Sequence, residues 1–297
     1  MTRHLLDVDD LTADELTAVL DLAEEPDPEP VLAGQGMALV FEKPSARTRN
    51  SMEMAIVQLG GHPVSVRGDE VGIDRREPAE DVARTLACYH AAIGARVFEH
   101  RVLERMAAVS PVPVVNLLSD EAHPLQALAD LLTLRQAWGG FKGRVLAYVG
   151  DGNNVCRSLG LGGALAGLEV RVGTPPGYGM PPEHADRLTA LGAEAVVCTR
   201  PEEAVEGADA VYTDVWASMG QEDEAGDRRR AFEGFGVDER LMAAAAPDAL
   251  FLHCLPAHRG EEVSAAVVDG PASRVWEQAA NRMHAARGLL LFLLGGA

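Results

Sequence analysis

The sequence predicts an α/β fold made of two doubly wound parallel-sheet domains, and three observations carry this prediction. Short apolar stretches typical of buried strands alternate with stretches of helical period along most of the 297 residues. A chain of this length commonly forms two cores rather than one. Gly139-Gly140 ends a long expected helix and a second alternating series begins at Lys142, so the domains should join near residues 135–142.

The first alternating series begins with a helix. Thr12 and Glu15 form a capping box that starts it, and we expect it to cover about residues 12–24. The charged segment 71–78 shows no periodicity, which indicates a loop. Strands are expected near residues 37–41, 63–66, 92–97 and 112–117, and helices over about 45–59, 79–90, 103–110 and 124–138.

The second series has the same alternation. Its expected strands lie near residues 145–149, 168–172, 194–198, 209–213 and 249–253, and its last helix covers about 273–294. Residues 175–182 and 220–236 are turn-rich or charged and are expected to be loops. Ligands of such sheets bind at the carboxyl ends of strands. The polar clusters described next all follow strands, so we expect them to line one cleft between the domains.

The first polar cluster surrounds the start of the second expected helix. Ser45 stands where an N-cap belongs, since its hydroxyl can accept from a free backbone N–H. The cluster also holds Lys43, Arg47, Thr48 and Arg49. First-turn positions normally favour acids, because the helix end is itself positive, so a bound anion would resolve the conflict. The alternative is a solvated basic helix start without a ligand.

The overall charge makes this cationic cluster unusual. The chain has 26 Lys and Arg against 45 Asp and Glu, a formal net charge of -19. Such acidity argues against nucleic acid or an anionic membrane surface as a partner. In a strongly acidic protein, a local group of positive charges needs a local reason.

The cysteines and apolar runs indicate a cytoplasmic protein. Cys88, Cys156, Cys198 and Cys254 are scattered and form no pair typical of a disulfide framework or zinc site, which suits a reducing compartment. The N-terminus is acidic and lacks the apolar core of a signal peptide. The longest apolar run, residues 289–294, is too short to span a bilayer.

Three further polar residues belong to the first series. Arg96 ends or follows an expected strand, and His123 and Gln126 stand one helical turn apart at a strand-to-helix junction. A histidine there can donate to a carbonyl oxygen, and a glutamine can pair with an amide. The alternative is a capping histidine and a surface glutamine.

Residues 150–154, Gly-Asp-Gly-Asn-Asn, follow a strand and suggest a dinucleotide site, but that interpretation fails. Val155 stands where the third glycine or alanine belongs, and no acidic residue follows the next strand. A nicotinamide-dependent oxidoreductase, whose fold would overlap, is therefore disfavoured. Asn154 can still present its amide to a carboxylate.

The remaining candidates lie late in the chain. Asp214 follows a strand and suits a cationic amine, although a turn cap is the alternative. His253, Cys254 and His258 could suggest metal ligation, but their spacing matches no standard zinc pattern, so we expect no metal. Arg282 stands among apolar residues of the last helix, where it either reaches solvent or meets an anion.

Together these stretches resemble the aspartate/ornithine carbamoyltransferase family, over essentially the whole chain and in the same order. Residues 45–49, Ser-Ala-Arg-Thr-Arg, resemble its carbamoyl-phosphate signature, and 123–126, His-Pro-Leu-Gln, its second carbamoyl-phosphate motif. Residues 214–220 resemble the Asp-x-x-x-Ser-Met-Gly motif of its ornithine-using members, and 253–256 the His-Cys-Leu-Pro motif. Any one of these motifs is a modest signal, but four in order are strong.

The resemblance implies an organisation and a set of site residues. It implies a carbamoyl-phosphate-binding domain over residues 1–135, an ornithine-binding domain over 142–273, and a last helix, 274–297, that packs back on the first domain. It implies that carbamoyl phosphate is bound by Ser45, Ala46, Arg47, Thr48, Arg96, His123, Gln126, Cys254, Leu255 and Arg282, and ornithine by Asn154, Asp214, Ser218 and Met219. It implies that catalysis depends on Arg47, Arg96, His123, Asp214, Cys254 and Arg282.

The implied activity is transfer of the carbamoyl group to the side-chain amine of L-ornithine, giving L-citrulline and phosphate in arginine metabolism. The family needs no cofactor and works as a homotrimer or a multiple of trimers. Two residues depart from its pattern: Ala46 stands where threonine is usual, and Gly72 where a glutamine or histidine often reaches the neighbouring subunit. A carbamoyltransferase for a related amine or amino acid, or a catalytically silent binding homologue, remains the alternative.

Overall fold

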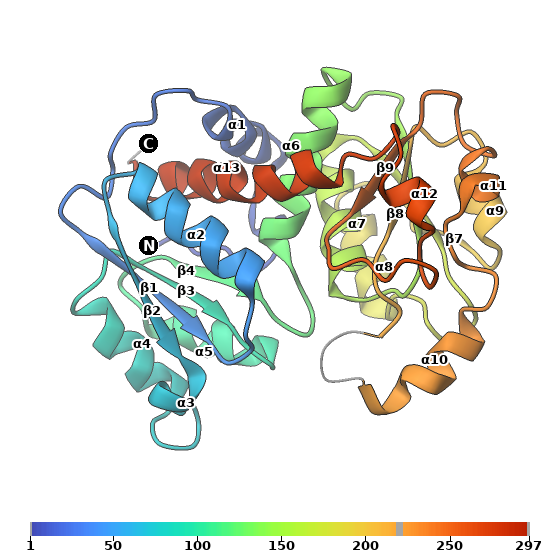
Figure 1. Ribbon diagram of the computed structural model, residues 1–297. Coiled ribbons are helices and arrows are strands. Elements are labelled where there is room, and N and C mark those ends of the chain that lie inside the picture. The colour runs from blue at the N-terminus through green and yellow to red at the C-terminus, as the bar shows by residue number, and fades with distance from the viewer. Residues whose placement is uncertain (1, 218–221, 296–297) are drawn as a thin grey trace. The chain divides into compact units, whose positions relative to one another are not determined.

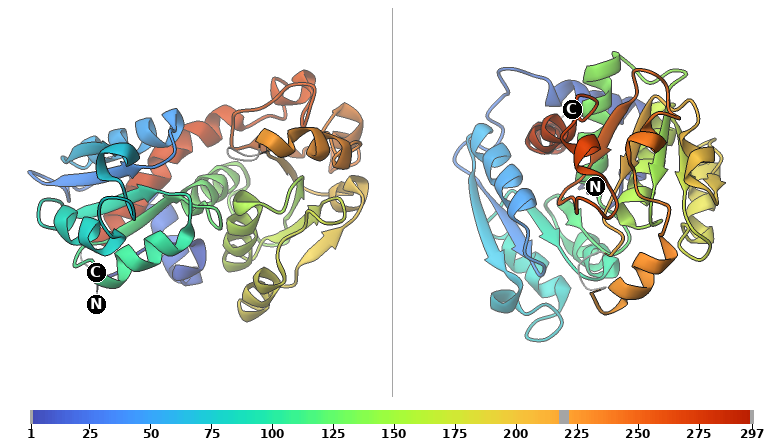
Figure 2. Two further views of the ribbon diagram at one scale, coloured as in Figure 1. Left: turned by 90° about the horizontal axis from the view of Figure 1, so that it is seen from below. Right: turned by 45° about the vertical axis from the view of Figure 1, so that its right-hand side comes forward.

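The computed structural model describes residues 2–217 and 222–295. Its contacts divide the chain into two compact units: Met1–Leu132 with Ala280–Ala297, and Thr133–Ala279. Two helices contribute to both units, α6 (Pro124–Trp138) and α13 (Val275–Leu294), the latter being the long red helix in Figure 1 and Figure 2. No helix within residues 2–217 and 222–295 is long and apolar enough to cross a bilayer.

The first unit contains a four-stranded parallel sheet in the order β2-β1-β3-β4. All four strands were expected from the sequence, to within two or three residues at their ends. They are β1 (Gly36–Phe41), β2 (His62–Arg67), β3 (Ala92–Arg96) and β4 (Val114–Leu118). Its complete helices are η1 (Val8–Asp10), α1 (Ala13–Ala23), α2 (Ala46–Gln58), α3 (Gly68–Val71), α4 (Ala79–Ala87) and α5 (His100–Val109).

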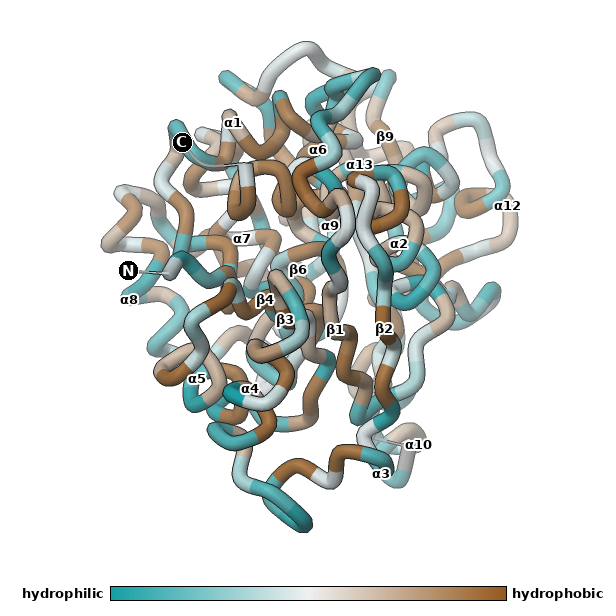
Figure 3. Tube along the Cα trace, turned by 90° about the vertical axis from the view of Figure 1, so that its left-hand side faces the viewer, coloured by the Kyte–Doolittle hydropathy of each residue, from teal (hydrophilic) through white to brown (hydrophobic). Residues whose placement is uncertain are grey.

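Helices cover both faces of this sheet, as expected of a doubly wound fold. Helices α4 and α5 cover one face (Figure 1), where Val82 and Leu103 share a buried core with strand residues such as Ile93. On the other side, α13 packs against α1 so closely that a Cβ at Gly288 would lie 2.5 Å from the Val19 carbonyl oxygen. The loop after α3 carries hydrophilic residues (Figure 3).

The second unit contains a five-stranded parallel sheet in the order β7-β6-β5-β8-β9. Its strands are β5 (Val145–Val149), β6 (Glu169–Gly173), β7 (Val196–Cys198), β8 (Ala210–Thr213) and β9 (Leu250–His253). Its complete helices are α7 (Asn154–Ala166), α8 (Pro182–Ala190), α9 (Pro201–Val205), η2 (Glu222–Glu224), α10 (Ala225–Ala231), α11 (Glu239–Met242) and α12 (Ala265–Val268). A buried core with Val211, Phe232 and Phe251 lies against one face of this sheet.

One of the segments expected to be loops contains a short helix, since α10 occupies seven residues of 220–236. The expected loop at 71–78 is confirmed, because α3 ends at Val71 and α4 begins at Ala79. Helix α10 has weak apolar periodicity, and it is held mainly by the burial of Arg228 and Phe232, because the Arg230–Asp227 pair is exposed and adds little. The charged composition of this stretch resembles that of a solvated loop, which explains the wrong expectation.

Each sheet has a point at which the strand order reverses. In the first unit it lies between β1 and β3, and in the second between β5 and β8. Doubly wound sheets bind ligands outside the carboxyl ends of strands at such points. Strand β1 leads to Ser45 and β3 ends at Arg96, whereas β5 leads to residues 150–153 and β8 to Asp214. The topology therefore places a candidate site at the reversal point of each sheet.

Candidate active site

The start of α2 has the N-cap that the sequence predicted. Ser45 has an extended backbone, φ −158° and ψ 110°, and its Oγ accepts from the Thr48 backbone N–H at 3.3 Å. No acidic residue occupies the first turn of α2. Arg49 pairs with Glu53 at 2.8 Å, whereas Arg47 is exposed and has no ion pair or hydrogen bond among the described residues. The positive end of the helix is therefore reinforced by Arg47 and open to an anion.

Behind this helix end, the Thr48 hydroxyl joins two buried arginines. Its Oγ1 accepts from Arg282 Nη2 at 2.8 Å and from Arg96 Nη1 at 3.3 Å. Thr48 is 1% exposed and both arginines are 5% exposed. Two guanidinium groups that share one hydroxyl in a low-dielectric site repel each other, and a multiply charged anion would offset that repulsion.

Gln126 has its amide orientation fixed by two neighbours. Its Nε2 donates to Asp130 Oδ1 at 2.7 Å, and its Oε1 accepts from Arg282. Because a carboxylate only accepts and a guanidinium only donates, these contacts leave one orientation of the amide. The carbonyl oxygen of Gln126 therefore faces the same arginine that contacts Thr48.

His123 lies directly before α6 and is 5% exposed. Burial, followed by the charges of Arg282 and Arg96, lowers the pKa of His123 well below its ordinary value. The imidazole is therefore neutral at pH 7, so it can donate one hydrogen bond without adding a third positive charge.

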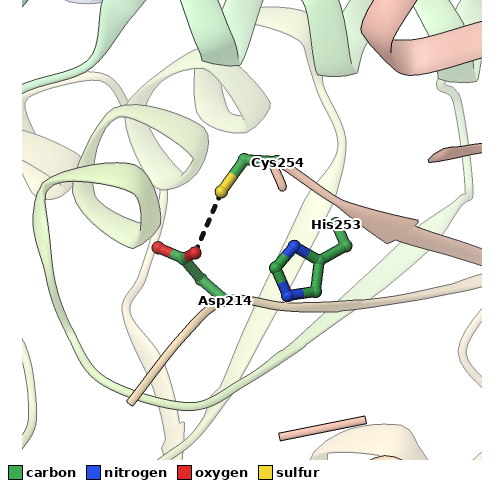
Figure 4. A group of neighbouring side chains, drawn as sticks. All are labelled: Asp214, His253 and Cys254. Atoms are coloured by element: carbon green, nitrogen blue, oxygen red, sulfur yellow. Dashed lines mark hydrogen bonds between the residues drawn. The ribbon is translucent and has the colours of Figure 1, made fainter. Parts of the chain in front are cut away.

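In the second unit, Asp214 is the centre of a separate polar cluster. Its Oδ1 accepts from the Val215 backbone N–H at 2.8 Å and from the Cys254 thiol at 2.9 Å, and its Oδ2 accepts from Asn153 Nδ2 at 2.9 Å. Figure 4 shows the Asp214 carboxylate and the Cys254 sulfur pointing toward each other, with the His253 ring beside them. A carboxylate offers about four acceptor positions, so Asp214 keeps roughly one for a ligand.

His253 holds the segment that follows it. Its Nδ1 accepts from the Leu255 backbone N–H at 2.9 Å, so the proton resides on Nε2, which faces buried Glu262 Oε1 at 3.2 Å. Leu255 has φ 61°, a left-handed conformation that costs a leucine roughly 1–2 kcal/mol, and this hydrogen bond helps to hold it there. Ligand atoms of Asp214, His253 and Cys254 lie within 4.8 Å of one another, but both nitrogens of His253 are engaged. These observations do not test the expectation that no metal binds, which stays a prediction.

Of the two asparagines at the start of α7, Asn153 orients Asp214 and was not selected from the sequence, whereas Asn154 stays the predicted partner of a ligand carboxylate. Asn153, the N-cap of α7, accepts from the N–H groups of Val155 and Cys156 and donates to Asp214, whereas Asn154 is the first helical residue. The signal was present in the sequence, because an asparagine directly before an apolar helix is a typical N-cap. Gly152 precedes it at a close backbone approach, where a Cβ would lie 2.4 Å from Met180 N.

The structure thus brings together Thr48, Arg96, Gln126 and Arg282 in one unit, and Asp214 and Cys254 in the other. Ser218 and Met219 lie outside the described residues. Ala46 is the first residue of α2 and is exposed, so it can contribute only its backbone N–H. Sequence reasoning missed the polar residues that orient these groups, namely half-buried Asn153 and the buried residues Asp130, Asp151, Arg228 and Glu262.

Comparison with known proteins gives a consistent result. Residues 3–136 match the family model described as "Aspartate/ornithine carbamoyltransferase, carbamoyl-P binding domain", and residues 142–293 match its Asp/Orn binding domain. The chain is 52% identical to ornithine carbamoyltransferase of Acidothermus cellulolyticus, over 100% of this chain and 98% of the relative. Similar solved structures include the ornithine carbamoyltransferase of Thermus thermophilus, with 48% identity, a TM-score of 0.90 and 99% of both chains covered. That of Pyrococcus furiosus has 43% identity and a TM-score of 0.94, with 99% of this chain and 98% of that chain covered.

Proposed function

This chain belongs to the aspartate/ornithine carbamoyltransferase family, and we propose that it transfers the carbamoyl group of carbamoyl phosphate to the side-chain amine of L-ornithine, giving L-citrulline and phosphate. Full-length relatives at about half identity carry the name of that activity. One structural observation carries the proposal furthest: Arg96 and Arg282 converge on the Thr48 hydroxyl at the N-terminus of α2. That arrangement suits a small molecule with a doubly charged phosphate and a polar carbonyl group.

The first unit is our candidate for the donor site. We infer that the phosphate binds the first-turn N–H groups of α2 together with cationic side chains, because a helix N-terminus and guanidinium groups both favour phosphate oxygens. In this proposal the phosphate contacts are Ser45, Ala46 through its backbone, Arg47, Thr48 and Arg96. As phosphate leaves with its negative charge, the same groups stabilise it.

The carbonyl group of carbamoyl phosphate needs N–H groups whose hydrogen bonds strengthen as negative charge develops on the carbonyl oxygen. Arg282 and neutral His123 are suited to this role, since both present N–H groups from buried positions. Gln126, whose carbonyl oxygen is held toward Arg282, is suited to accept from the carbamoyl amide. The buried positions and contacts of these three side chains support these roles.

The second unit is our candidate for the site of the acceptor amino acid. We infer that the α-amino group of ornithine takes the remaining acceptor position of Asp214, and that Asn154, the first residue of α7, faces its carboxylate. Ser218, Met219 and Leu255 are assigned to ornithine or the attacking amine by family resemblance alone. The attacking amine must be neutral, which costs roughly 4–5 kcal/mol at pH 7 for a group with a pKa of about 10.4. A cationic pocket lowers that cost, and the proton can go to the Asp214 carboxylate, or to Cys254 once its thiol has given its own proton to Asp214.

The acceptor preference follows from charge. Aspartate would bring a second carboxylate toward Asp214, and the two would repel each other. Putrescine has no carboxylate and would leave an asparagine partner unused. A related diamine or amino acid is thus the second candidate, and the carboxylate-pairing amide at the start of α7 favours ornithine over putrescine.

An assay of citrulline formation tests the proposal directly. Purified protein with carbamoyl phosphate and ornithine should release phosphate and citrulline in equal amounts, and putrescine or aspartate should replace ornithine at least about a hundredfold less efficiently, as expected where a buried polar group loses its partner. Absence of citrulline would exclude the activity and leave a binding role, and equal turnover of putrescine would exclude the assignment of ornithine.

We further infer a homotrimer or a multiple of trimers that works in arginine metabolism in the cytoplasm. The support is family membership, together with four cysteines that form no disulfide. Gly72, the C-cap of α3, has φ 65° and packs against Arg76, so a glutamine-like contact to a neighbouring subunit would have to come from another residue, for which Arg75 or Arg76 is the candidate. Native mass spectrometry measures the assembly: a mass of three chains or a multiple of three is expected, and a monomer or dimer would contradict it.

A further inference from the structure

Arg228, on α10, is buried at the carboxyl edge of the second sheet and lies outside the substrate contacts proposed above. Its side chain is 9% exposed. Its Nη1 donates to Asp151 Oδ2 at 2.8 Å and to the Trp216 carbonyl oxygen at 3.1 Å, and its Nε donates to Glu224 at 3.1 Å. The guanidinium carbon also lies 5.2 Å from the centre of the Tyr178 ring.

Apart from Glu224, which directly precedes α10, these partners belong to three different loops. Asp151 follows β5, Tyr178 follows β6 and Trp216 follows β8, so one side chain ties together the segments that leave three neighbouring strands. Only arginine combines a planar fork of several donors with a face that stacks on an aromatic ring. A lysine ammonium has three donors but no planar face, so it could not keep all of these contacts.

Both flanks of Asp214 are connected to this arginine. Trp216 stands two residues after Asp214, and Asp151 stands two residues before Asn153, whose amide donates to Asp214. Burial raises the pKa of Asp151, although the guanidinium beside it favours the charged form. A buried ion pair of this kind adds little net stability and is better suited to fixing one arrangement of its surroundings.

We propose that Arg228 is a positioning residue for the acceptor amino acid, which acts by holding the Asp214 carboxylate between two clamped loops. This inference rests on the proposed function, in which Asp214 receives the α-amino group. All contacts of Arg228 described above lie within the second unit, whereas Thr48, Arg96 and Arg282 lie in the first. Loss of Arg228 should therefore weaken the handling of ornithine and leave the binding of carbamoyl phosphate unchanged.

The test compares Arg228→Gln and Arg228→Lys with Arg229→Gln, a matched control. Arg229 neighbours Arg228 on the same helix, but it is 62% exposed and pairs with Glu261 at the surface. We expect Arg228→Gln to raise the KM for ornithine about 10- to 100-fold, the range that a small misplacement of a binding group produces. The KM for carbamoyl phosphate should change by no more than about twofold. The KM for ornithine of Arg228→Lys should lie between those of Arg228→Gln and the wild type, and both KM values of Arg229→Gln should match the wild type.

Norvaline, which is ornithine without its side-chain amine, gives a second readout. Its binding should change the fluorescence of Trp216 in the wild type. The norvaline concentration at the midpoint of this change should rise in Arg228→Gln by the same factor as the KM for ornithine. If Arg228→Gln fails to fold, Asp151→Asn removes the ion pair with an isosteric side chain and should show the same selective rise. Equal changes in both KM values, or a fall in kcat alone, would overturn the inference. A wild type that makes no citrulline would instead overturn the proposed function.

Discussion

Thr48 is the residue on which the donor site depends most directly, because its hydroxyl is the shared acceptor of Arg96 and Arg282. Thr48→Val keeps the shape of the side chain and removes that acceptor. Hydrogen bonds to charged groups contribute roughly 1.5–3 kcal/mol, so we expect about a 10- to 150-fold loss of affinity for phosphonoacetamide, a stable analogue of carbamoyl phosphate, measured by calorimetry. Thr85→Val, at an exposed position on α4, should bind like the wild type.

His123 makes the stability of the protein depend on pH. Its folded-state pKa lies well below the ordinary 6.5, so below pH 6.5 the unfolded chain binds a proton that the folded chain does not. The free energy of unfolding should therefore fall as pH decreases from 6.5, by at most about 1.4 kcal/mol per pH unit from this group. The free energies of unfolding of His123→Asn and the wild type, measured in urea, should therefore become more similar as the pH decreases from 6.5. A constant difference from pH 7.5 to pH 5 would contradict the lowered pKa.

The attacking amine gives the activity a different pH dependence. Its neutral fraction rises about tenfold per pH unit below a pKa of about 10.4, so kcat/KM for ornithine should rise with a logarithmic slope of about 1 between pH 6.5 and 8.5. Because His123 is already neutral over this range, any activity that remains in His123→Asn should show the same slope. A flat profile in the wild type would show that the amine enters the reaction already neutral.

At the scale of elements, the close contact of α13 with α1 depends on Gly288. A Cβ there would lie 2.5 Å from the Val19 carbonyl oxygen and 2.6 Å from the Ala23 backbone nitrogen, so one helix would have to move. We expect Gly288→Ala to destabilise the protein by about 1–3 kcal/mol in urea unfolding, and, because Arg282 is on the same helix, to weaken binding of phosphonoacetamide. Gly226→Ala, on α10 with nothing within 4 Å of its Cβ, is the control and should be neutral or slightly stabilising.

Elements with a strong local signal could be predicted from the sequence. Ser45 and the Thr12–Glu15 capping box were placed correctly, because an N-cap depends on a few consecutive residues. Helix α10 was missed, because its stability comes from burying Arg228 against residues from distant parts of the chain.

The same limit applies to the candidate site. Sequence motifs selected Thr48, Gln126 and Asp214, and the structure shows each as the centre of a set of contacts. The residues that orient them could not be found this way. Asp130 sits in an apolar helix and Glu262 in a charged loop, and only the folded chain shows that both are 0% exposed.

On the scale of the whole molecule, a chain of net charge -19 places two buried arginines, Arg96 and Arg282, on one hydroxyl. Each unit has its own sheet with its own reversal of strand order, and each reversal lies beside one of the two polar clusters. The topology thus offers one candidate binding position in each unit, and we propose that the donor binds at the first and the acceptor at the second. The central claim is that the start of α2, with Thr48, Arg96 and Arg282, holds the phosphate of the donor.

A crystal structure with N-(phosphonoacetyl)-L-ornithine, which joins analogues of both substrates in one molecule, tests this claim most directly. We predict that its phosphonate contacts the first-turn N–H groups of α2 and Arg96, that its carbonyl oxygen contacts Arg282, and that its α-amino group contacts Asp214. A phosphonate bound elsewhere, with Thr48, Arg96 and Arg282 keeping only the contacts described above, would contradict the account.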